Sequence, residues 1–288
     1  MYHCTRMPKN SLHVFRELNK RISLFNKIES ESLAFIVMEE IFGLEKTQVL
    51  TGQPLHIDQK TEKKLTSIID RLEIDEPIQY IFGRTQFYGR YFKVNHHTLI
   101  PRPETEGLVE LIITAINKRE SLRILDLGTG SACIPISLAL ETSGHLIEAM
   151  DIDPKALALA HENAKSYGVS IRLFQGNIFE LTLKDTYDIF ISNPPYVRIS
   201  ERKYMRKNVL LYEPSQALFV PDKDPLKYYR AILELAKDQL VSNGQIFFEI
   251  NENLAIELSE LAQLYHFTRY KISKDLAGKN RYLQITVP

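Results

Sequence analysis

The chain of 288 residues is 44% apolar, which is enough to fill the cores of one large domain and a smaller one and excludes a disordered or fibrous protein. Lysine plus arginine equals aspartate plus glutamate at 36 each, so the charge balance argues against a direct, specific nucleic-acid partner or an anionic membrane surface. Only Cys4 and Cys133 are present, without metal-ligand or disulfide spacing, and no window approaches the roughly 18 apolar residues of a membrane span, so we expect a cytoplasmic protein without a metal site.

Residues 1–76 are predicted to form a small N-terminal helical bundle. Apolar side chains recur there at helical spacing, as at Leu33, Ile36, Val37 and Ile41, and again at Leu65, Ile68, Ile69 and Leu72. In residues 77–100 aromatic residues are punctuated by Gly83 and Gly89, and this pattern predicts a β-hairpin linker to residues 101–288. We attribute the aromatic residues to packing, because large aromatic rings are more often core than ligand cage.

Residues 101–288 show the alternation of strand and helix that is typical of a doubly wound, Rossmann-like α/β sheet. Seven strands are predicted, at residues 123–127, 147–152, 171–175, 188–192, 245–250, 270–273 and 281–287. Helices fall between the first five, and the clearest begins at an Asp153 cap with Pro154 in its first turn and ends at Gly168. Only a short segment separates the last two strands, so they must form an antiparallel hairpin.

A glycine-rich turn follows the first of these strands and precedes an apolar helix. Glycines there let the backbone approach a ligand closely and direct helix N–H groups at it. At the end of the next strand, Asp151 offers a carboxylate that can accept hydrogen bonds from both hydroxyls of a ribose. The predicted cofactor-binding residues of this region are Asp126, Gly128, Thr129, Gly130, Ser131, Ala132 and Asp151.

Two cofactors compete for such a site, a dinucleotide and S-adenosylmethionine. The turn lacks the third glycine of dinucleotide sites, and Asp126 precedes it, where an acid can engage the amino acid end of S-adenosylmethionine directly or by orienting the loop. The third strand is followed by Asn177, a hydrogen-bonding group, and by Ile178, an apolar wall for an adenine ring. These features favour S-adenosylmethionine, although Asn177 alone is equally consistent with a turn residue.

Asn193, Pro194, Pro195 and Tyr196 directly follow the fourth strand, at the edge of the sheet where ligands bind. A planar amide or amine nitrogen is a poor nucleophile because its lone pair is delocalised, so a catalyst has to orient it. The Asn193 side-chain oxygen and the Pro194 carbonyl can each accept one N–H, the prolines fix the backbone, and Tyr196 can stack on the flat acceptor. We therefore assign Asn193, Pro194 and Tyr196 as catalytic, all four residues as substrate-binding, and the Asn193 NH2 group as a cofactor contact.

The chain resembles a known family, the HemK/PrmC-type protein-(glutamine-N5) methyltransferases, which modify peptide chain release factors. The matching segments are QYIFG (79–83), FYG (87–89), IPRPETE (100–106), DLGTG (126–130), NPPY (193–196), YEP (212–214) and DLAGK (275–279). The NPPY motif also occurs in nucleic-acid amino-methyltransferases and gives only the chemistry. The IPRPETE segment and the helical N-terminal domain narrow the choice.

The resemblance implies transfer of a methyl group from S-adenosyl-L-methionine to the side-chain amide N5 of the glutamine in a Gly-Gly-Gln loop of release factors. It also implies that residues 1–76 recognise the substrate and that residues 101–288 form the S-adenosylmethionine-dependent methyltransferase domain. Four positions depart from the family pattern: Ala132 and Asn251 replace common glycines, Asn177 replaces a common acid, and Ile178 stands where an aromatic ring can face adenine.

Other acceptors and other classes stay open on the sequence alone. A ribosomal-protein glutamine or the N6 of adenine would need the same chemistry, although the neutral charge balance argues against a duplex-binding enzyme. A non-catalytic S-adenosylmethionine-binding module would have no use for the acceptor ligands of residues 193–196, and a dinucleotide-dependent oxidoreductase is a weaker alternative. Arg102 and Glu104 are equally consistent with closing the joint between domains and with a substrate or cofactor contact.

Overall fold

The computed structural model describes residues 9–22, 26–117, 119 and 121–288, and the chain divides into two compact units, Met1–Phe82 and Gly83–Pro288. The boundary falls inside the segment expected as a linker (77–100): a short helix groups with the first unit, and the hairpin after it groups with the second. Cys4 lies outside the described residues, and Cys133 is a buried free thiol. Within the described ranges, no helix is both long and apolar enough to cross a bilayer.

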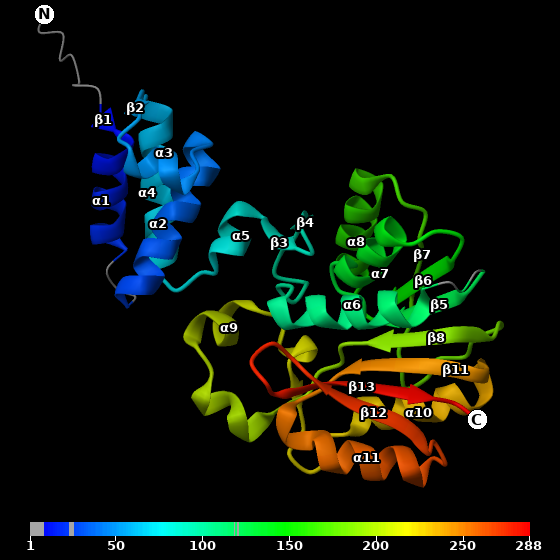
Figure 1. The fold of residues 1–288 in the computed structure, drawn as a ribbon. Coiled ribbons are helices and arrows are strands. Elements are labelled where there is room, and N and C mark those ends of the chain that lie inside the picture. Colours follow the sequence, from blue (N-terminus) through cyan, green and yellow to red (C-terminus); the bar gives the residue numbers. More distant parts are fainter. Residues whose placement is uncertain (1–8, 23–25, 118, 120) are drawn as a thin grey trace, which may run out of the picture. The chain divides into compact units, whose positions relative to one another are not determined.

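The first unit is the helical bundle that the sequence predicted (Figure 1). Its helices are α1 (Ser11–Arg21), α2 (Lys27–Phe42), α3 (Lys46–Leu50), α4 (Gln59–Glu73) and α5 (Ile78–Phe82). Asn10, Asn26 and Asp58 cap α1, α2 and α4 by accepting a hydrogen bond from a backbone N–H of the first turn. Val37 and Ile69 are fully buried, in agreement with the predicted periodicity. A short antiparallel pair, β1 (Lys9–Asn10) with β2 (Pro54–Leu55), was not predicted.

The second unit is built on a seven-stranded sheet, which confirms the predicted α/β fold. Its strands are β5 (Arg123–Leu127), β6 (Leu146–Asp151), β7 (Arg172–Gln175), β8 (Tyr187–Ser192), β11 (Leu240–Glu249), β12 (Arg269–Lys274) and β13 (Asn280–Thr286). The spatial order is β12-β13-β11-β8-β5-β6-β7. β13 runs in the direction opposite to the other six strands. The predicted terminal hairpin is therefore confirmed, and β13 is the strand that inserts beside β11. β11 begins five positions before the expected Gln245 because the pairing with β8 is irregular between Leu240 and Gln245.

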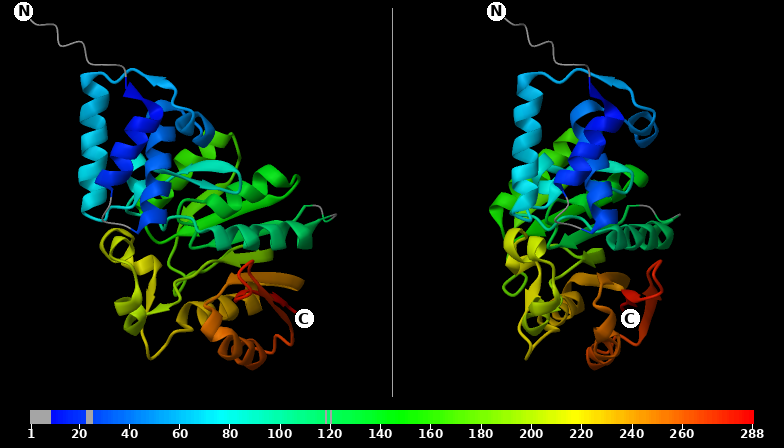
Figure 2. Two further views of the ribbon diagram at one scale, coloured as in Figure 1. Left: turned by 60° about the vertical axis from the view of Figure 1, so that its left-hand side comes forward. Right: turned by 90° about the vertical axis from the view of Figure 1, so that its left-hand side faces the viewer.

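Helices cover both faces of this sheet, as Figures 1 and 2 show. They are α6 (Pro103–Ile116), α7 (Cys133–Glu141) and α8 (Pro154–Tyr167) on one face, and α10 (Lys227–Gln239) and α11 (Ala255–Leu264) on the other. The prediction of a helix between the third and fourth strands was wrong, because residues 176–186 connect β7 to β8 by turns and irregular backbone alone. Successive residues of a strand point to opposite faces, so Ile189 and Ile191 pack with the first group while Phe190 packs with the second. As predicted, α8 is capped by Asp153 and ends at Gly168, which has a φ of 65°.

The predicted hairpin is present as β3 (Arg84–Phe87) paired antiparallel with β4 (Arg90–Lys93). Phe87 and Phe92 are fully buried in the core under α6, which supports a packing role for these aromatic residues. The segment between β8 and α10 carries short elements only: β9 (Val197–Arg198), α9 (Lys207–Tyr212) and β10 (Phe219–Val220). β9 and β10 pair in parallel, and this pairing brings the start of β10 back beside the residues that follow β8.

Candidate active site

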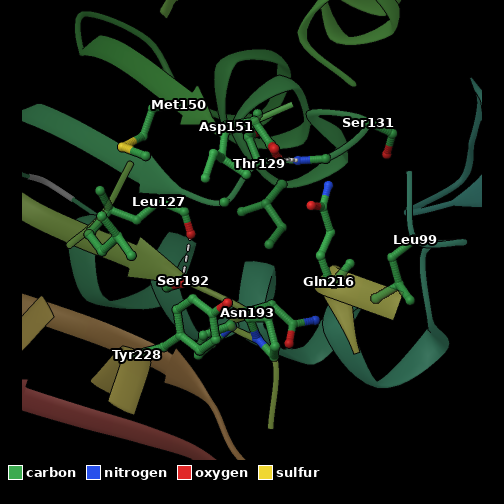
Figure 3. A pocket seen from close by; sticks show the side chains of 18 of the residues that line it. Leu99, Leu127, Thr129, Ser131, Met150, Asp151, Ser192, Asn193, Gln216 and Tyr228 are labelled. Atoms are coloured by element: carbon green, nitrogen blue, oxygen red, sulfur yellow. Dashed lines mark hydrogen bonds between the residues drawn. The ribbon is translucent and has the colours of Figure 1, made fainter. Parts of the chain in front are cut away.

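A pocket of about 280 Å³ lies in the second unit, at the carboxyl ends of β5, β6, β7 and β8. This is the edge of an open α/β sheet where ligands bind. In Figure 3 the labelled residues Thr129, Ser131 and Asp151 lie on one side of the pocket, and Ser192, Asn193 and Tyr228 lie on the opposite side. The structure thus brings together the glycine turn and the start of the NPPY segment, two regions that are more than 60 residues apart in the sequence.

The glycine turn is held to the end of β6 by three hydrogen bonds. The N–H groups of Gly128 and Thr129 both donate to the carbonyl of Met150, at 3.0 and 2.8 Å, and Gly130 N–H donates to Oδ2 of Asp151 at 2.8 Å. Gly128 and Gly130 have φ values of 84° and 55°, a left-handed conformation that glycine adopts without strain. The two glycines are therefore required by the turn itself, and their missing side chains leave the pocket open.

Asp151 lines the pocket with a carboxylate whose two oxygens are already anchored. Oδ1 accepts from the N–H of Asp153 at 3.0 Å, and Oδ2 accepts from Gly130. Burial raises the pKa of Asp151, and the two backbone hydrogen bonds oppose that rise by favouring the charged form. Each oxygen keeps a further lone pair for a ligand hydroxyl, so the carboxylate is oriented before a ribose arrives.

Asp126 and Ala132 are fully buried and do not line the pocket. Both carboxylate oxygens of Asp126 and the hydroxyl of Thr129 are buried and make no hydrogen bond of good geometry, although the hydroxyl lies near enough to the carboxylate to favour its charged form. Burial raises the pKa of Asp126 to about 7, and repulsion from Asp151 adds to that rise, while Thr129 opposes it. A buried acid without a partner is costly to the fold, and a cationic ligand group nearby would offset that cost.

Asn177 and Ile178 line the pocket wall after β7, and Asn177 Oδ1 accepts a hydrogen bond from the N–H of Phe179 at 3.2 Å. This bond supports the turn role that the sequence had left open for Asn177. Beside them lies an aromatic pair that sequence reasoning missed: the rings of Phe179 and Tyr228 are 5.1 Å apart, and Nζ of Lys227 lies 4.8 Å from each. The sequence offered a signal for Tyr228: it lies outside the buried face of α10 that Tyr229 and Ile232 form, so this aromatic ring is not needed for the core.

The NPPY segment leaves the end of β8, where the Ser192 hydroxyl donates to the carbonyl of Leu127 at 2.6 Å. Asn193, Pro194 and Pro195 line the pocket, but Tyr196 does not. The Tyr196 hydroxyl instead donates to Oε1 of Glu249 at 3.0 Å, and burial is the main reason that its pKa is raised. Stacking of this ring on an acceptor stays a prediction.

Residues outside the predicted set also reach this region. Asn193 Nδ2 donates to Oγ1 of Thr105 at 3.3 Å, and Thr105 donates in turn to Oε2 of Glu249 at 2.7 Å. Arg102 lines the pocket and pairs at 2.6 Å with the buried carboxylate of Glu213, so the arginine is held within the second unit. Glu104 uses its backbone carbonyl, which accepts from the Tyr282 hydroxyl at 2.6 Å. Among the described residues, no group of three or more histidine, cysteine, aspartate or glutamate side chains is placed to hold a metal ion.

Comparison with known proteins identifies the family. The model of the methyltransferase small domain matches residues 106–220, and that of the PrmC N-terminal domain matches residues 16–83. A release factor glutamine methyltransferase from Flavobacterium psychrophilum is 43% identical over 267 residues, which are 91% of this chain and 94% of that protein. The chain belongs to the release factor glutamine methyltransferase family.

A second member of this family, from Bacteroides thetaiotaomicron, is 37% identical over 257 residues, which are 88% of this chain and 92% of that protein. The resemblance found in the sequence is thus confirmed, and the chain is an S-adenosyl-L-methionine-dependent methyltransferase.

Solved structures bear out the fold. The hMettl16 catalytic domain, solved in complex with MAT2A 3'UTR hairpin 6, superposes with a TM-score of 0.56 at 15% identity, covering 83% of this chain and 85% of that one. A methyltransferase from Pyrococcus furiosus gives a TM-score of 0.51 at 18% identity, covering 80% of this chain and 98% of that one. At such low identity these structures support the methyltransferase fold alone.

Proposed function

We propose that this enzyme transfers the methyl group of S-adenosyl-L-methionine to the side-chain amide N5 of the glutamine in the Gly-Gly-Gln motif of peptide chain release factors. The observation that carries the proposal is the Asn193 amide: its NH2 group is held by Thr105, which leaves Oδ1 free to accept an N–H in the pocket. The two relatives, both release factor glutamine methyltransferases, support the choice of substrate. Such a substrate also places the enzyme in the cytoplasm, with no membrane or specific nucleic-acid partner.

The residues of the glycine turn and of the strand ends fit the proposed cofactor. Asp151 would accept from the ribose, and the backbone of Gly128 to Ser131 would face the ligand. The buried Asp126 carboxylate, which has no partner, would balance the positive charge of the amino acid end. Asn177 and Ile178, together with Phe179 and Tyr228, would border the adenine.

In this proposal the enzyme accelerates methyl transfer by holding the glutamine amide in the orientation that the reaction needs. Bound S-adenosylmethionine supplies an electrophilic methyl group on a sulfonium sulfur. Asn193 Oδ1 and the Pro194 carbonyl accept the two N–H groups of the glutamine amide, so that its nitrogen faces the methyl at a near-attack distance of about 3 to 3.5 Å. Methyl transfer would form an N–C bond as the S–C bond breaks, and it would release S-adenosylhomocysteine and one amide proton to solvent; Asn193 and Pro194 would orient the amide without acting as bases. Pro195 fixes the backbone between these groups and Tyr196, whose ring is proposed to face the acceptor.

The residues that line the pocket all belong to the second unit. We propose that residues 1–76 recognise the release factor, that residues 77–100 act as a linker and that residues 101–288 carry the methyl transfer. The match of residues 16–83 to the PrmC N-terminal domain supports a family-specific role for the first segment.

The test is peptide mass spectrometry of purified release factor, intact ribosomes and DNA after incubation with the enzyme and isotope-labelled S-adenosylmethionine. Label on the glutamine of the Gly-Gly-Gln loop is the expected result. Label on a ribosomal protein or on adenine would replace the proposed substrate, and cofactor binding without any label would identify a non-catalytic module. Asn193→Ala is expected to lower kcat by roughly 10²- to 10³-fold, as for loss of one preorganised hydrogen-bonding group, while cofactor binding changes little.

A further inference from the structure

One buried carboxylate, that of Glu249, holds both ends of the NPPY segment. Its Oε1 accepts from the hydroxyl of Tyr196 at 3.0 Å, and its Oε2 accepts from the hydroxyl of Thr105 at 2.7 Å. Thr105 in turn accepts from Nδ2 of Asn193 at 3.3 Å. Glu249 and Thr105 are 1% and 3% exposed, so water does not compete for these bonds. This series of hydrogen bonds joins Asn193 to Thr105, 88 positions apart in the sequence, and Thr105 to Glu249, 144 positions apart.

The direction of each hydrogen bond follows from the groups present. Both oxygens of Glu249 accept in this structure, so Thr105 spends its single hydroxyl proton on Glu249. The lone pairs of Thr105 then face Asn193, and only the NH2 end of the Asn193 amide can meet them. If the amide were turned over, Oδ1 would lie against those lone pairs and the NH2 group would occupy the acceptor position.

The neighbours of Glu249 favour its charged, accepting form, although burial outweighs them and leaves its pKa raised. Burial raises its pKa, whereas the hydrogen bonds from Thr105 and Tyr196 and the attraction of Arg281 on β13 oppose that rise. Glu104 on α6 contributes repulsion. On α10, the hydroxyl of Tyr229 donates to the backbone carbonyl of Glu249 at 3.0 Å, which fixes the end of β11 without touching the carboxylate.

We propose that Glu249 and Thr105 are positioning residues for methyl transfer, which act through Asn193 by fixing its amide with the oxygen toward the acceptor nitrogen. The inference rests on the proposed function, because only an acceptor that donates an N–H gains from this orientation. Neither residue transfers a proton or binds the methyl donor. They affect the rate only by raising the fraction of enzyme molecules in which Asn193 points its Oδ1 toward the glutamine amide.

The alternative is that the same bonds merely tie α6 to the end of β11. The two cases differ in a double-mutant cycle on kcat. Thr105→Val removes the hydroxyl and keeps the shape of the side chain, and it is expected to lower kcat by about 10- to 100-fold with the KM for cofactor nearly unchanged. In an Asn193→Ala background the same substitution is expected to have no further effect on kcat, because the group that it orients is gone.

Conservative and control variants sharpen the cycle. Thr105→Ser keeps the hydroxyl and is expected to restore kcat to within a few-fold of wild type. Tyr229→Phe removes a buried hydroxyl bonded to the main chain of Glu249, and we expect it to lower the melting temperature but to leave kcat unchanged. A Thr105→Val effect of equal size in both backgrounds, or one matched by Tyr229→Phe, would overturn the proposal.

A measurement without substrate separates this inference from the proposed function. In protein labelled with ¹⁵N-asparagine, the side-chain NH2 signals of Asn193 can be assigned by their loss in Asn193→Ala. One of the two protons is expected to exchange slowly with solvent in the wild type and in Thr105→Ser, and rapidly in Thr105→Val and Glu249→Gln. Identical exchange in Thr105→Val and the wild type would refute the positioning role even if release factor were methylated, and slow exchange would stand even if another substrate were found.

Discussion

The N–H of Gly130 donates to the carboxylate of Asp151 at 2.8 Å, so this bond joins the glycine turn after β5 to the end of β6 at the edge of the pocket. The second oxygen of Asp151 is held by the N–H of Asp153, which is also the cap of α8. The Asp151 carboxylate therefore accepts hydrogen bonds from both the glycine turn and the start of α8, and it is itself the candidate ribose contact.

Asp151→Ala is expected to weaken the binding of S-adenosylmethionine by about 10- to 100-fold, because charge-assisted hydrogen bonds to the ribose and to two backbone N–H groups are lost together. Binding of the release factor alone should be unchanged. Calorimetric titrations with each ligand separately check both statements. Asp185→Ala is a matched control, since Asp185 is an exposed carboxylate that pairs with Arg123 away from the pocket. An unchanged cofactor affinity in Asp151→Ala would remove this residue from the site.

Asp126→Asn is expected to stabilise the ligand-free protein, and by more at pH 8 than at pH 5. The pKa of this carboxyl is raised to about 7 in the fold, so between about pH 4 and pH 7 the unfolded chain binds fewer protons than the native one. Wild-type stability therefore falls as the pH rises through this window, by at most about 4 kcal/mol. Thermal unfolding of both proteins across this pH range is the measurement. A stability difference that does not change with pH would contradict the explanation.

The same carboxyl should release a proton when the cofactor binds. Below about pH 7 it is mostly protonated in the free protein, and cationic groups of S-adenosylmethionine nearby would favour its charged form. Titrations at pH 6 in two buffers of different ionisation enthalpy report this proton directly. We expect the buffer dependence in the wild type and its absence in Asp126→Asn.

The two substitutions of Tyr196 separate its ring from its hydroxyl. Tyr196→Phe keeps the ring but leaves an oxygen of Glu249 without a donor, so we expect a loss of about 1 to 3 kcal/mol in the free energy of unfolding and a mild decrease in kcat. Tyr196→Ala should lower kcat severely if the ring stacks on the acceptor. Steady-state kinetics and chemical unfolding of both variants give the comparison, and a larger effect on kcat from Phe than from Ala would assign the role to the hydroxyl.

The Phe179 and Tyr228 pair is expected to contribute to cofactor affinity. Tyr228→Ala should weaken S-adenosylmethionine binding by about 2- to 10-fold, the range of one aromatic contact, and Tyr228→Phe should not. Direct binding titrations measure both. Tyr204→Ala serves as the control, because Tyr204 is 80% exposed and does not line the pocket. Equal affinity in Tyr228→Ala and Tyr204→Ala would show that the ring pair has no part in binding.

Local signals in the sequence were enough for most of the fold. Strand periodicity, the Asp153 cap and Gly168 placed α8 and most strand ends to within a residue or two, because each depends on neighbours along the chain. The start of β11 was missed by five positions. The position of β13 between β12 and β11 was not predictable from that information. Antiparallel pairing of the last two strands followed from their short connection, but which of them meets β11 depends on tertiary packing.

The site shows the same division. Gly128, Asp151 and Asn193 lie at strand ends, so topology alone brought them to one edge of the sheet. Thr105 lies in the IPRPETE segment that marked the family, but neither it nor Glu249 carried a signal for a role beside Asn193, since a threonine in a first helical turn and a glutamate at the end of an apolar strand have ordinary local explanations. Only the three-dimensional arrangement shows that both point at the NPPY segment.

The order of strands at one end of the sheet constrains how the protein can fold. Within the sheet β12 bonds only to β13, the strand that follows it in the sequence, and β13 bonds to β11. β12 therefore cannot join the sheet in chain order. It can pair only once β13 has docked on β11, or the two strands dock together as a preformed hairpin. Until then the edge of β11 is an unpaired apolar strand, so this interval is the one in which the chain is most exposed to aggregation.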